Sequence, residues 1–283
     1  MPDYKSDVGK LDVLTLDGAV AVATHPTDEI WYNDYGLQNA DVITQYVRVS
    51  APNLDLSQRS FPRADGVYAE SAYRRQNRIK VAGTIKAATR AALELAMDDM
   101  RQALSAYGST MRILWGGAAR YYDDCYAVTL DAIFDGRDHY NVDWCPFSVE
   151  FTSQQPYARD ASRTTNDVSG TASTSPVGFT VANAGSAPTG PIVTVTVVTA
   201  GGLLSLTLTN GENGDAMSIT RSWSNGDTVE VNGEDRTVKI NGVAADFLGV
   251  IPMAEAGDNA FLLSMTGAGY AVAISEQHFN RYL

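Results

Sequence analysis

Apolar and polar positions alternate most clearly in residues 77–86. Ile79, Val81, Gly83 and Ile85 share one face of an extended chain, and the residues between them are mostly Arg, Lys and Thr. Successive side chains of a β-strand point to opposite faces of its sheet. This period of two therefore predicts a strand with one buried face.

The pattern then changes to a helical period over residues 89–104. The apolar stripe consists of Leu93, Met97, Met100 and Leu104, at spacings of 4, 3 and 4. These spacings place all four on one side of an α-helix. Thr89 is the expected N-cap, and Gly108 lies where a C-terminal stop is expected. Leu95 falls about 200° around the helix from Leu93, so a second apolar patch is expected to face another element or another subunit.

Further strands are expected on both sides of this helix. The candidate segments are Thr110–Trp115, Tyr121–Phe134 and Val142–Phe151. In the last of these, the alternation changes phase at Cys145-Pro146, which predicts a β-bulge or an edge position that tolerates proline. Residues 50–76 are polar and irregular, with a turn signal at Asp65-Gly66, and predict a projecting hairpin or loop.

The last hundred residues show short alternating segments separated by turn pairs. The expected strands are Pro191–Val198, Leu203–Thr209, Met217–Trp223, Asp227–Val231, Thr237–Ile240, Ala260–Met265 and Tyr270–Ile274. The turn pairs are Asn213-Gly214, Asn225-Gly226, Asn232-Gly233 and Asn241-Gly242. Asn and Gly tolerate the positive φ of tight hairpins, so the pattern predicts an antiparallel β-sandwich, such as a jelly roll.

The composition changes between these two parts. Residues 159–178 are rich in Ser, Thr, Gly and Asp and offer little to bury, so we expect a linker there. The predicted organisation is an N-terminal domain over residues 1–158, a linker over 159–178 and a C-terminal sandwich over 179–283. The expected fold class is mainly β, with an α+β N-terminal domain that contains one main helix.

The overall charge restricts the classes of partner. The 283 residues carry a net charge of −12, which argues against a nucleic-acid binder and against docking on an anionic membrane. No apolar run approaches the 18 residues of a membrane span, and Met1–Leu11 lacks the apolar core of a secretory signal. Cys125 and Cys145 fit no zinc or redox spacing, so we expect reduced, partly buried thiols in a protein made in a reducing cytoplasm.

Catalytic and metal-binding motifs are not evident. The sequence contains no phosphate-binding P-loop and no G-x-S-x-G elbow. His25, His139 and His278 are far apart and form no H-x-x-x-H pair, so ordinary hydrogen-bonded imidazoles are expected. We therefore expect no enzyme activity, no cofactor and no metal site.

Two acidic segments invite a different interpretation. Asp131, Asp135, Asp138 and Asp143 form a cluster that is compatible with a calcium site or a glycosidase pair, but the spacing does not match an EF-hand, and a solvated turn is favoured. The segment from Asn210 to Asp215 is likewise compatible with a calcium loop, although a hairpin turn fits it better.

The order of features along the chain resembles a known family. An R-x-I-x-V-x-G-x-I strand begins at Arg78, a helix begins near T-R-A-A-L-E, and F-x-V-x-F from Phe147 is followed by Q-P-Y-A. Then come N-x-G-x-A-P-T-G-P (Asn183–Pro191), G-D-x-V (Gly226–Val229) and G-D-N-A-F (Gly257–Phe261). In order, spacing and two-part layout, this sequence resembles the distal tail (Dit) proteins of siphophages over almost its whole length, less clearly in the first 45 residues.

The resemblance implies a structural virion protein of the phage tail tip. The N-terminal domain would form a hexameric ring around a DNA channel, and the C-terminal domain would be a galectin-like sandwich. The implied partners are further copies of the chain, the tail tube protein, the tail-tip hub protein and the tape-measure protein. The assembly would take place in the bacterial host cytoplasm.

Several residues are candidates for these contacts. For the subunit interface they are Leu95, Arg59, Arg63, Arg74, Arg75 and Arg78, with the Arg side chains equally suited to a solvated loop. An alternative function is carbohydrate binding for host attachment, with Trp223 as a candidate glycan contact, although a core position is favoured for it. A third hypothesis is a glycoside hydrolase that uses Asp131, Asp135 or Asp138.

Overall fold

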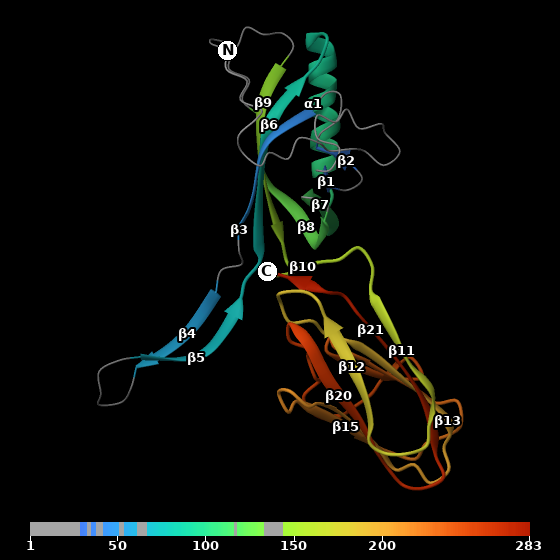
Figure 1. Cartoon of the computed structure of the whole chain (residues 1–283). Helices are drawn as coiled ribbons and strands as arrows, with labels where there is room; N and C mark the ends of the chain where they lie inside the picture. Colours follow the sequence, from blue (N-terminus) through green and yellow to red (C-terminus); the bar gives the residue numbers. More distant parts are fainter. Residues whose placement is uncertain are drawn as a thin grey trace. The chain divides into compact units, whose positions relative to one another are not determined.

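The computed structural model describes residues 29–32, 35–37, 42–50, 54–60, 67–115, 118–132 and 144–283. The chain divides into two compact units, one ending at Ala161 and the other spanning Ser162–Tyr282. The described residues are mainly β, as predicted, and contain one α-helix, which lies in the first unit. The ribbon is shown in Figure 1.

The first unit contains one large antiparallel sheet and the helix. Its elements are β1 (Glu29–Tyr32), β2 (Tyr35–Gly36), β3 (Val42–Ser50), β4 (Leu54–Ser60), β5 (Val67–Arg74), β6 (Asn77–Lys86), α1 (Arg90–Leu104), β7 (Ser109–Trp115), β8 (Ala118–Ala132), β9 (Trp144–Ser153) and β10 (Ala158–Arg159). The main strand order is β2-β1-β7-β8-β9-β6-β3, and β10 adds a short pairing with β8. Strand β6 has the predicted bounds and pairs with β3 on one side and β9 on the other.

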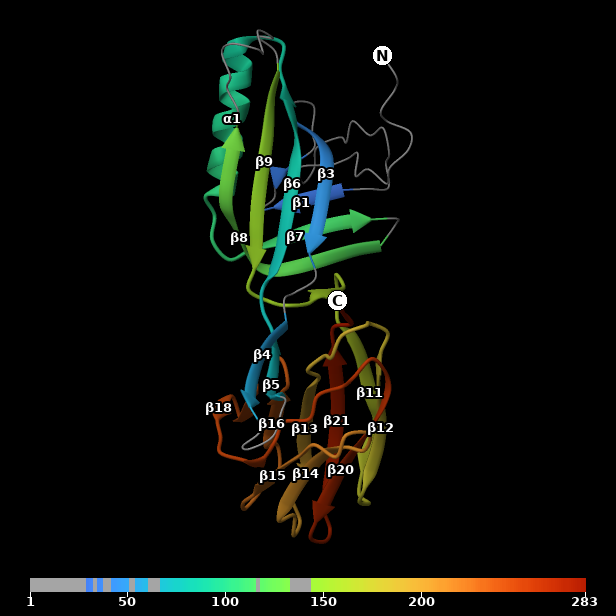
Figure 2. The same ribbon diagram turned by 90° about the vertical axis from the view of Figure 1, so that its left-hand side faces the viewer.

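Helix α1 covers one face of this sheet (Figure 2). Its buried residues are Leu93, Ala96, Met97, Met100 and Leu104, which confirms the predicted stripe. The N-cap is Thr89, whose Oγ1 accepts a hydrogen bond from the Ala92 amide at 3.2 Å. Under the helix lie Ile79, Val81 and Ile85 of β6 with Phe147, Val149 and Phe151 of β9, all buried. The apolar face of the strands, with a period of two, and the apolar stripe of the helix, with a period of 3.6, thus form one core.

Strand β9 differs from its prediction in one detail. Cys145 is buried in phase with Phe147, Val149 and Phe151, and the pairing of β9 with β6 has no register shift at Pro146. The predicted bulge at Cys145-Pro146 is therefore wrong. Free cysteine packs as a small apolar residue, so Cys145 continues the buried face and Trp144 lies on the opposite one.

The described residues between 50 and 76 form the two strands of the expected hairpin. Strands β4 and β5 pair with each other as a separate two-stranded sheet that connects β3 to β6. In Figure 1 this hairpin extends away from the large sheet of its unit. The pairing contains one register shift, between Ser57 and Gln58.

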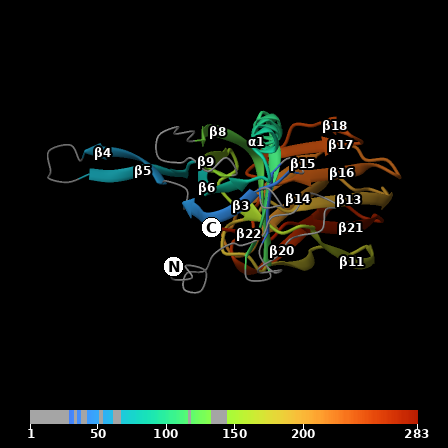
Figure 3. The same cartoon turned by 90° about the horizontal axis from the view of Figure 1, so that it is seen from above.

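The second unit is a β-sandwich. Its strands are β11 (Thr164–Ala172), β12 (Val177–Asn183), β13 (Ile192–Thr199), β14 (Ser205–Asn210), β15 (Ala216–Thr220), β16 (Thr228–Asn232), β17 (Thr237–Ile240), β18 (Val243–Ala244), β19 (Leu248–Gly249), β20 (Gly257–Thr266), β21 (Ala271–His278) and β22 (Arg281–Tyr282). One sheet has the order β11-β21-β13-β16-β17-β18, visible in Figure 3, and the other has the order β12-β20-β14-β15-β19. All seven predicted strands are present.

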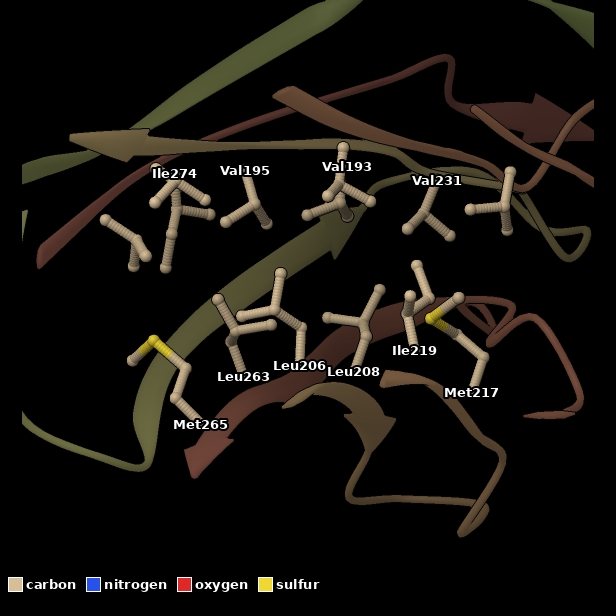
Figure 4. Packing of buried hydrophobic residues seen from close by; sticks show 14 of the residues in the cluster. Val193, Val195, Leu206, Leu208, Met217, Ile219, Val231, Leu263, Met265 and Ile274 are labelled. Carbon is tan, nitrogen blue, oxygen red and sulfur yellow. The ribbon is translucent and has the colours of Figure 1, made fainter. Parts of the chain in front are cut away.

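The inner faces of the two sheets form the core of this unit. Val193, Val195, Val231 and Ile274 from the six-stranded sheet face Leu206, Leu208, Met217, Ile219, Leu263 and Met265 from the five-stranded sheet (Figure 4). The alternating burial of every long strand follows from this packing, because each strand turns one face inward and one face outward.

The segment expected to be a linker belongs to this sandwich. Residues 164–172 form β11, which pairs with β21, and β12 begins at Val177. The prediction of a linker over residues 159–178 is therefore wrong for most of its length. Strand β11 is polar because it is an edge strand, which needs few apolar residues to keep its place in a sheet.

Candidate subunit interface

The exposed side of α1 presents the leading candidate contact residue. Leu95 lies away from the buried stripe and is 64% exposed in the chain. Arg90 donates a hydrogen bond to Glu94 at 3.1 Å, and Arg101 donates one to Asp98 at 2.8 Å. These charges are therefore paired within the helix beside Leu95. Asp99, one turn beyond Leu95, is also exposed, so a partner that covers Leu95 has to leave this carboxylate in solvent or supply a cation for it.

The candidate arginines lie in or near the hairpin. Arg74 and Arg75 are exposed at the end of β5, and Arg78 is exposed on β6. Arg78 lies 3.6 Å from Glu150 of β9, an ion pair on the solvent side of the sheet. Exposed pairs of this kind contribute little to stability, so Arg78 can exchange its partner at little cost. Arg59 falls in β4, and Arg63 lies outside the described residues.

Trp223 is a core residue. It is only 9% exposed, belongs to the sandwich core, and donates from Nε1 to the carbonyl of Leu204 at 3.4 Å. The guanidinium of Arg221 lies 5.4 Å from the ring centroid. The ring is therefore not presented to solvent as a platform on which a sugar could stack.

The acidic candidates are only partly described. Asp131 is exposed at the end of β8, whereas Asp135, Asp138 and Asp143 lie outside the described residues. The segment from Asn210 to Asp215 is the hairpin turn between β14 and β15, closed by a hydrogen bond from the Gly214 amide to the Asn210 carbonyl at 2.9 Å. Within the described part of the chain, no group of three or more His, Cys, Asp or Glu side chains is placed to hold a metal ion.

The two cysteines are free, buried thiols. Burial raises the pKa of Cys125 to about 12 and also raises the pKa of Cys145. A thiol that stays protonated at neutral pH is a poor nucleophile. Neither cysteine is therefore suited to catalysis in the folded chain.

His278 is the one histidine among the described residues, and it is buried in an ion pair. Its Nδ1 lies 2.8 Å from Oε1 of Glu276, and its Nε2 lies 3.0 Å from the carbonyl oxygen of Ala182. Burial alone would lower the pKa of His278, but the hydrogen bond to Glu276 and its charge, with smaller contributions from Ala182 and Asn280, raise it above its ordinary value. The histidine thus links β21 to β12 of the opposite sheet.

The motifs that carry the family resemblance are structural in this unit. Asn183 donates to the carbonyls of Ala187 and Glu255 at 2.8 and 3.1 Å, and Asn259 donates to those of Glu255 and Gly257, both at 2.9 Å. The buried side-chain amides of Asn183 and Asn259 thus donate hydrogen bonds to backbone carbonyl groups in loops and at the start of a strand. The two asparagines are part of the sequence motifs, but the motifs alone do not reveal these hydrogen bonds.

The G-D-x-V segment fixes a turn in the same way. Asp227 accepts hydrogen bonds from the Ser224 amide and from Asn241 Nδ2, both at 2.9 Å. Asn241 in turn accepts from the Thr228 amide at 2.8 Å. The bond from Asn241, followed by that from Ser224, lowers the pKa of Asp227. The carboxylate thereby joins two successive turns.

Glycines allow close approach of two loops. A Cβ on Gly190 would overlap the backbone of Gly233, and a Cβ on Gly233 would lie 2.7 Å from Cα of Gly190. The sequence predicted that Gly233 forms a tight turn with positive φ. Gly233 does not have a positive φ, and the close contact with the backbone of Gly190 explains why a glycine stands there. The second glycine of N-x-G-x-A-P-T-G-P is thus required by packing.

Comparison with known proteins finds one family model that matches part of the sequence and one solved structure that shares the fold. Residues 184–253 match the family model of the siphovirus-type tail component, C-terminal domain. The Dit protein of phage SPP1, described as a paradigm of the hub adsorption apparatus in Gram-positive infecting phages, shares the fold with a TM-score of 0.67 at 16% identity. That match covers 90% of this chain and 99% of the SPP1 chain.

Other comparisons add little. The baseplate of phage p2 in its activated conformation matches with a TM-score of 0.35 at 10% identity, over 88% of this chain and 96% of that chain. No curated protein matches the sequence. Residues 184–253 are thus similar to a siphovirus tail-component domain, and the chain shares its fold with the SPP1 Dit protein. Both findings agree with the resemblance that the order of the motifs indicated.

In the part of the chain that the structure describes, no helix has the length and apolar character needed to cross a membrane.

Proposed function

We propose that the chain is the subunit of a closed hexameric ring at the tail tip. The ring would join the tail tube to the tail-tip hub beneath the tape-measure protein and would leave a channel for DNA. The single observation that carries the subunit contact is the exposed Leu95 on the outer side of α1, beside the ion pairs Arg90–Glu94 and Arg101–Asp98. A ring needs two different surfaces that meet head to tail, and the outer side of α1 supplies one of them.

The second surface is proposed to include the hairpin β4–β5 and its flanking arginines. The hairpin forms a separate sheet, and Arg74, Arg75 and Arg78 lie in or beside it. Glu94 and Asp98 of the helix provide acidic groups of opposite sign. Since both carboxylates already have partners in the helix, a neighbouring arginine would share them rather than replace a missing ion pair.

The test is the mass of the full-length protein in solution, from light scattering after size exclusion. The expected mass is six or twelve times the subunit mass of 30.4 kDa. The variant Leu95→Arg should lower this mass, with an unchanged circular dichroism spectrum because the side chain is exposed. Leu204→Arg is the matched control, since Leu204 is 59% exposed in the other unit.

The outcomes separate the possibilities. A Leu95→Arg ring of unchanged mass would remove Leu95 from the interface. Global unfolding of this variant would assign Leu95 to the core of its own unit. A monomeric wild type at every concentration would leave assembly to a partner protein, and the ring would then have to be sought with the tail tube or hub protein present.

The carbohydrate-binding alternative loses its main support, because Trp223 is buried. Glycan-array binding by the full-length chain would revive it. The hydrolase hypothesis is tested by replacing Asp131, Asp135 and Asp138 together, and retained function of that variant would reject it.

A further inference from the structure

The outward face of the five-stranded sheet β12-β20-β14-β15-β19 is almost free of charge. The outward positions of β12, β20, β14 and β15 are Gly, Ala, Ser or Thr, except for Leu262 in the middle of β20 and Asp258 at its start. In Figure 1, β12 and β20 lie side by side, and β14 and then β15 follow on the far side of β20 in the strand order. The unit therefore presents a flat sheet surface made of small, neutral side chains.

The strand register brings three exposed aliphatic residues onto this face. Leu248 of β19 pairs with Ser218 of β15, an outward position. Two residues later, the Val250 amide donates to the carbonyl of Ala216 at 2.8 Å, so Val250 continues the same face. Ala216 pairs with Thr209, and Thr209 pairs with Leu262. Val250 and Leu262 thus lie in one row across the sheet with Ala216 and Thr209 between them, and Leu248 lies two residues from Val250 on the same face.

These side chains are open to solvent. Leu248 is 75% exposed, Val250 is 52% exposed and Leu262 is 37% exposed. Large aliphatic side chains gathered on one uncharged surface mark an interaction site more often than scattered ones do. Their core-facing neighbours, such as Leu263 and Met217, are buried, so the exposed set is not needed to complete the sandwich core.

Charge favours one occupant for this face. The chain carries a net charge of −12, so two copies repel each other over most orientations. The neutral face is a surface on which they can meet without burying unpaired carboxylates, which would be costly. Two flat sheet faces pack well at about 10 Å separation when their outward side chains are small.

We propose that this face binds a second copy of the same chain, sheet against sheet, about a two-fold axis. Five strands about 4.8 Å apart and about six residues long give a footprint of roughly 450 Å² per copy. The pair would bury on the order of 1,000 Å² in total, the lower limit for a specific interface. The contact is therefore weak between single chains, and it strengthens where several copies are already held together.

This contact lies in the second unit and does not depend on the ring contact at Leu95. In free rings, it would join one ring to another. In single chains, it would give dimers. The two contacts can therefore be tested separately in one set of variants.

The experiment is sedimentation velocity of the full-length chain from about 1 to about 100 μM, a range that covers weak association. The expected result is a concentration-dependent doubling of the smallest species, which persists in Leu95→Arg. Val250→Glu should move the doubling to at least about tenfold higher concentration, because each pair then buries two unpaired carboxylates.

Val243→Glu is the matched control. Val243 is 69% exposed on β18, in the other sheet, so it receives the same charge at an exposed site away from the face. Leu248→Glu provides a second variant of the face in case Val250→Glu perturbs the neighbouring turn. Absence of doubling in the wild type, or equal effects of Val250→Glu and Val243→Glu, would overturn the proposal.

Discussion

The buried pair of His278 and Glu276 should make the stability of the sandwich depend on pH. Both side chains are almost fully buried, and Glu276 Oε2 has no hydrogen-bond partner among the described residues. The pKa of His278 is raised in the folded chain. A raised folded pKa means that protonation favours folding. The stabilisation is complete below the unfolded pKa of about 6.5 and is lost as the pH rises through the folded pKa.

The perturbation that isolates this effect is Glu276→Gln. It keeps the size of the side chain but removes the charge that raises the pKa of His278. Removing one partner of a buried pair costs about 3 kcal/mol or more. At an m-value of about 1.5 kcal/mol per molar urea, the midpoint near pH 6 should fall by about 2 M.

The assay is urea unfolding of the full chain, monitored by pulsed hydrogen exchange and mass spectrometry. Peptides from residues 257–278 report on the unfolding of the sandwich. The urea concentration at the midpoint of wild-type unfolding should decrease as the pH is raised from about 6 to about 8.5. In Glu276→Gln, the midpoint should no longer depend on pH in this way. Glu212→Gln, an exposed carboxylate in a turn, is the control. A wild-type midpoint that is constant over this range, or one that rises, would refute the reasoning.

Three further predictions concern packing and reactivity. Leu93→Ala should destabilise the first unit by about 2–5 kcal/mol, measured by thermal unfolding, because it empties a buried site under α1. Cys125 and Cys145 should resist a thiol reagent near pH 8 until urea unfolds the chain, and fast labelling of the native protein would contradict their burial. Gly190→Ala should lower the melting temperature through overlap with a neighbouring loop, whereas Gly178→Ala, whose added Cβ meets only ordinary contacts, should not.

Periodicity predicted the elements that have one strongly apolar face. Strand β6 and helix α1 were found at their predicted positions, because their buried residues recur at spacings that only one conformation brings together. The position of Leu95 away from the buried stripe of α1 followed from the same geometry, but its exposure did not, because a further element of the same unit could have covered it. What covers Leu95 depends on a second surface, and a sequence pattern does not reveal which distant surfaces match.

The failures come from residues whose role is set by neighbours in space. Strand β11 was mistaken for a linker because hydrogen bonds to β21, rather than an apolar pattern, hold it in the sheet. Cys145 was not counted with the buried face, and a bulge was inferred in its place. The close approach of Gly190 and Gly233 joins residues 43 positions apart, which no local rule detects.

Strand β11 also limits how copies of the sandwich can associate. An exposed strand edge is a template on which another chain can add a strand, and crowding of identical subunits raises that hazard. Strand β11 is polar and has a register shift between Val168 and Thr171, and from it Asn166 Nδ2 reaches across to the carbonyl of Thr180 on β12, at 3.0 Å. The edges at the other side, β18 and β19, are two residues long. Such edges disfavour open-ended β-polymerisation of the sandwich, even at a high local concentration of copies.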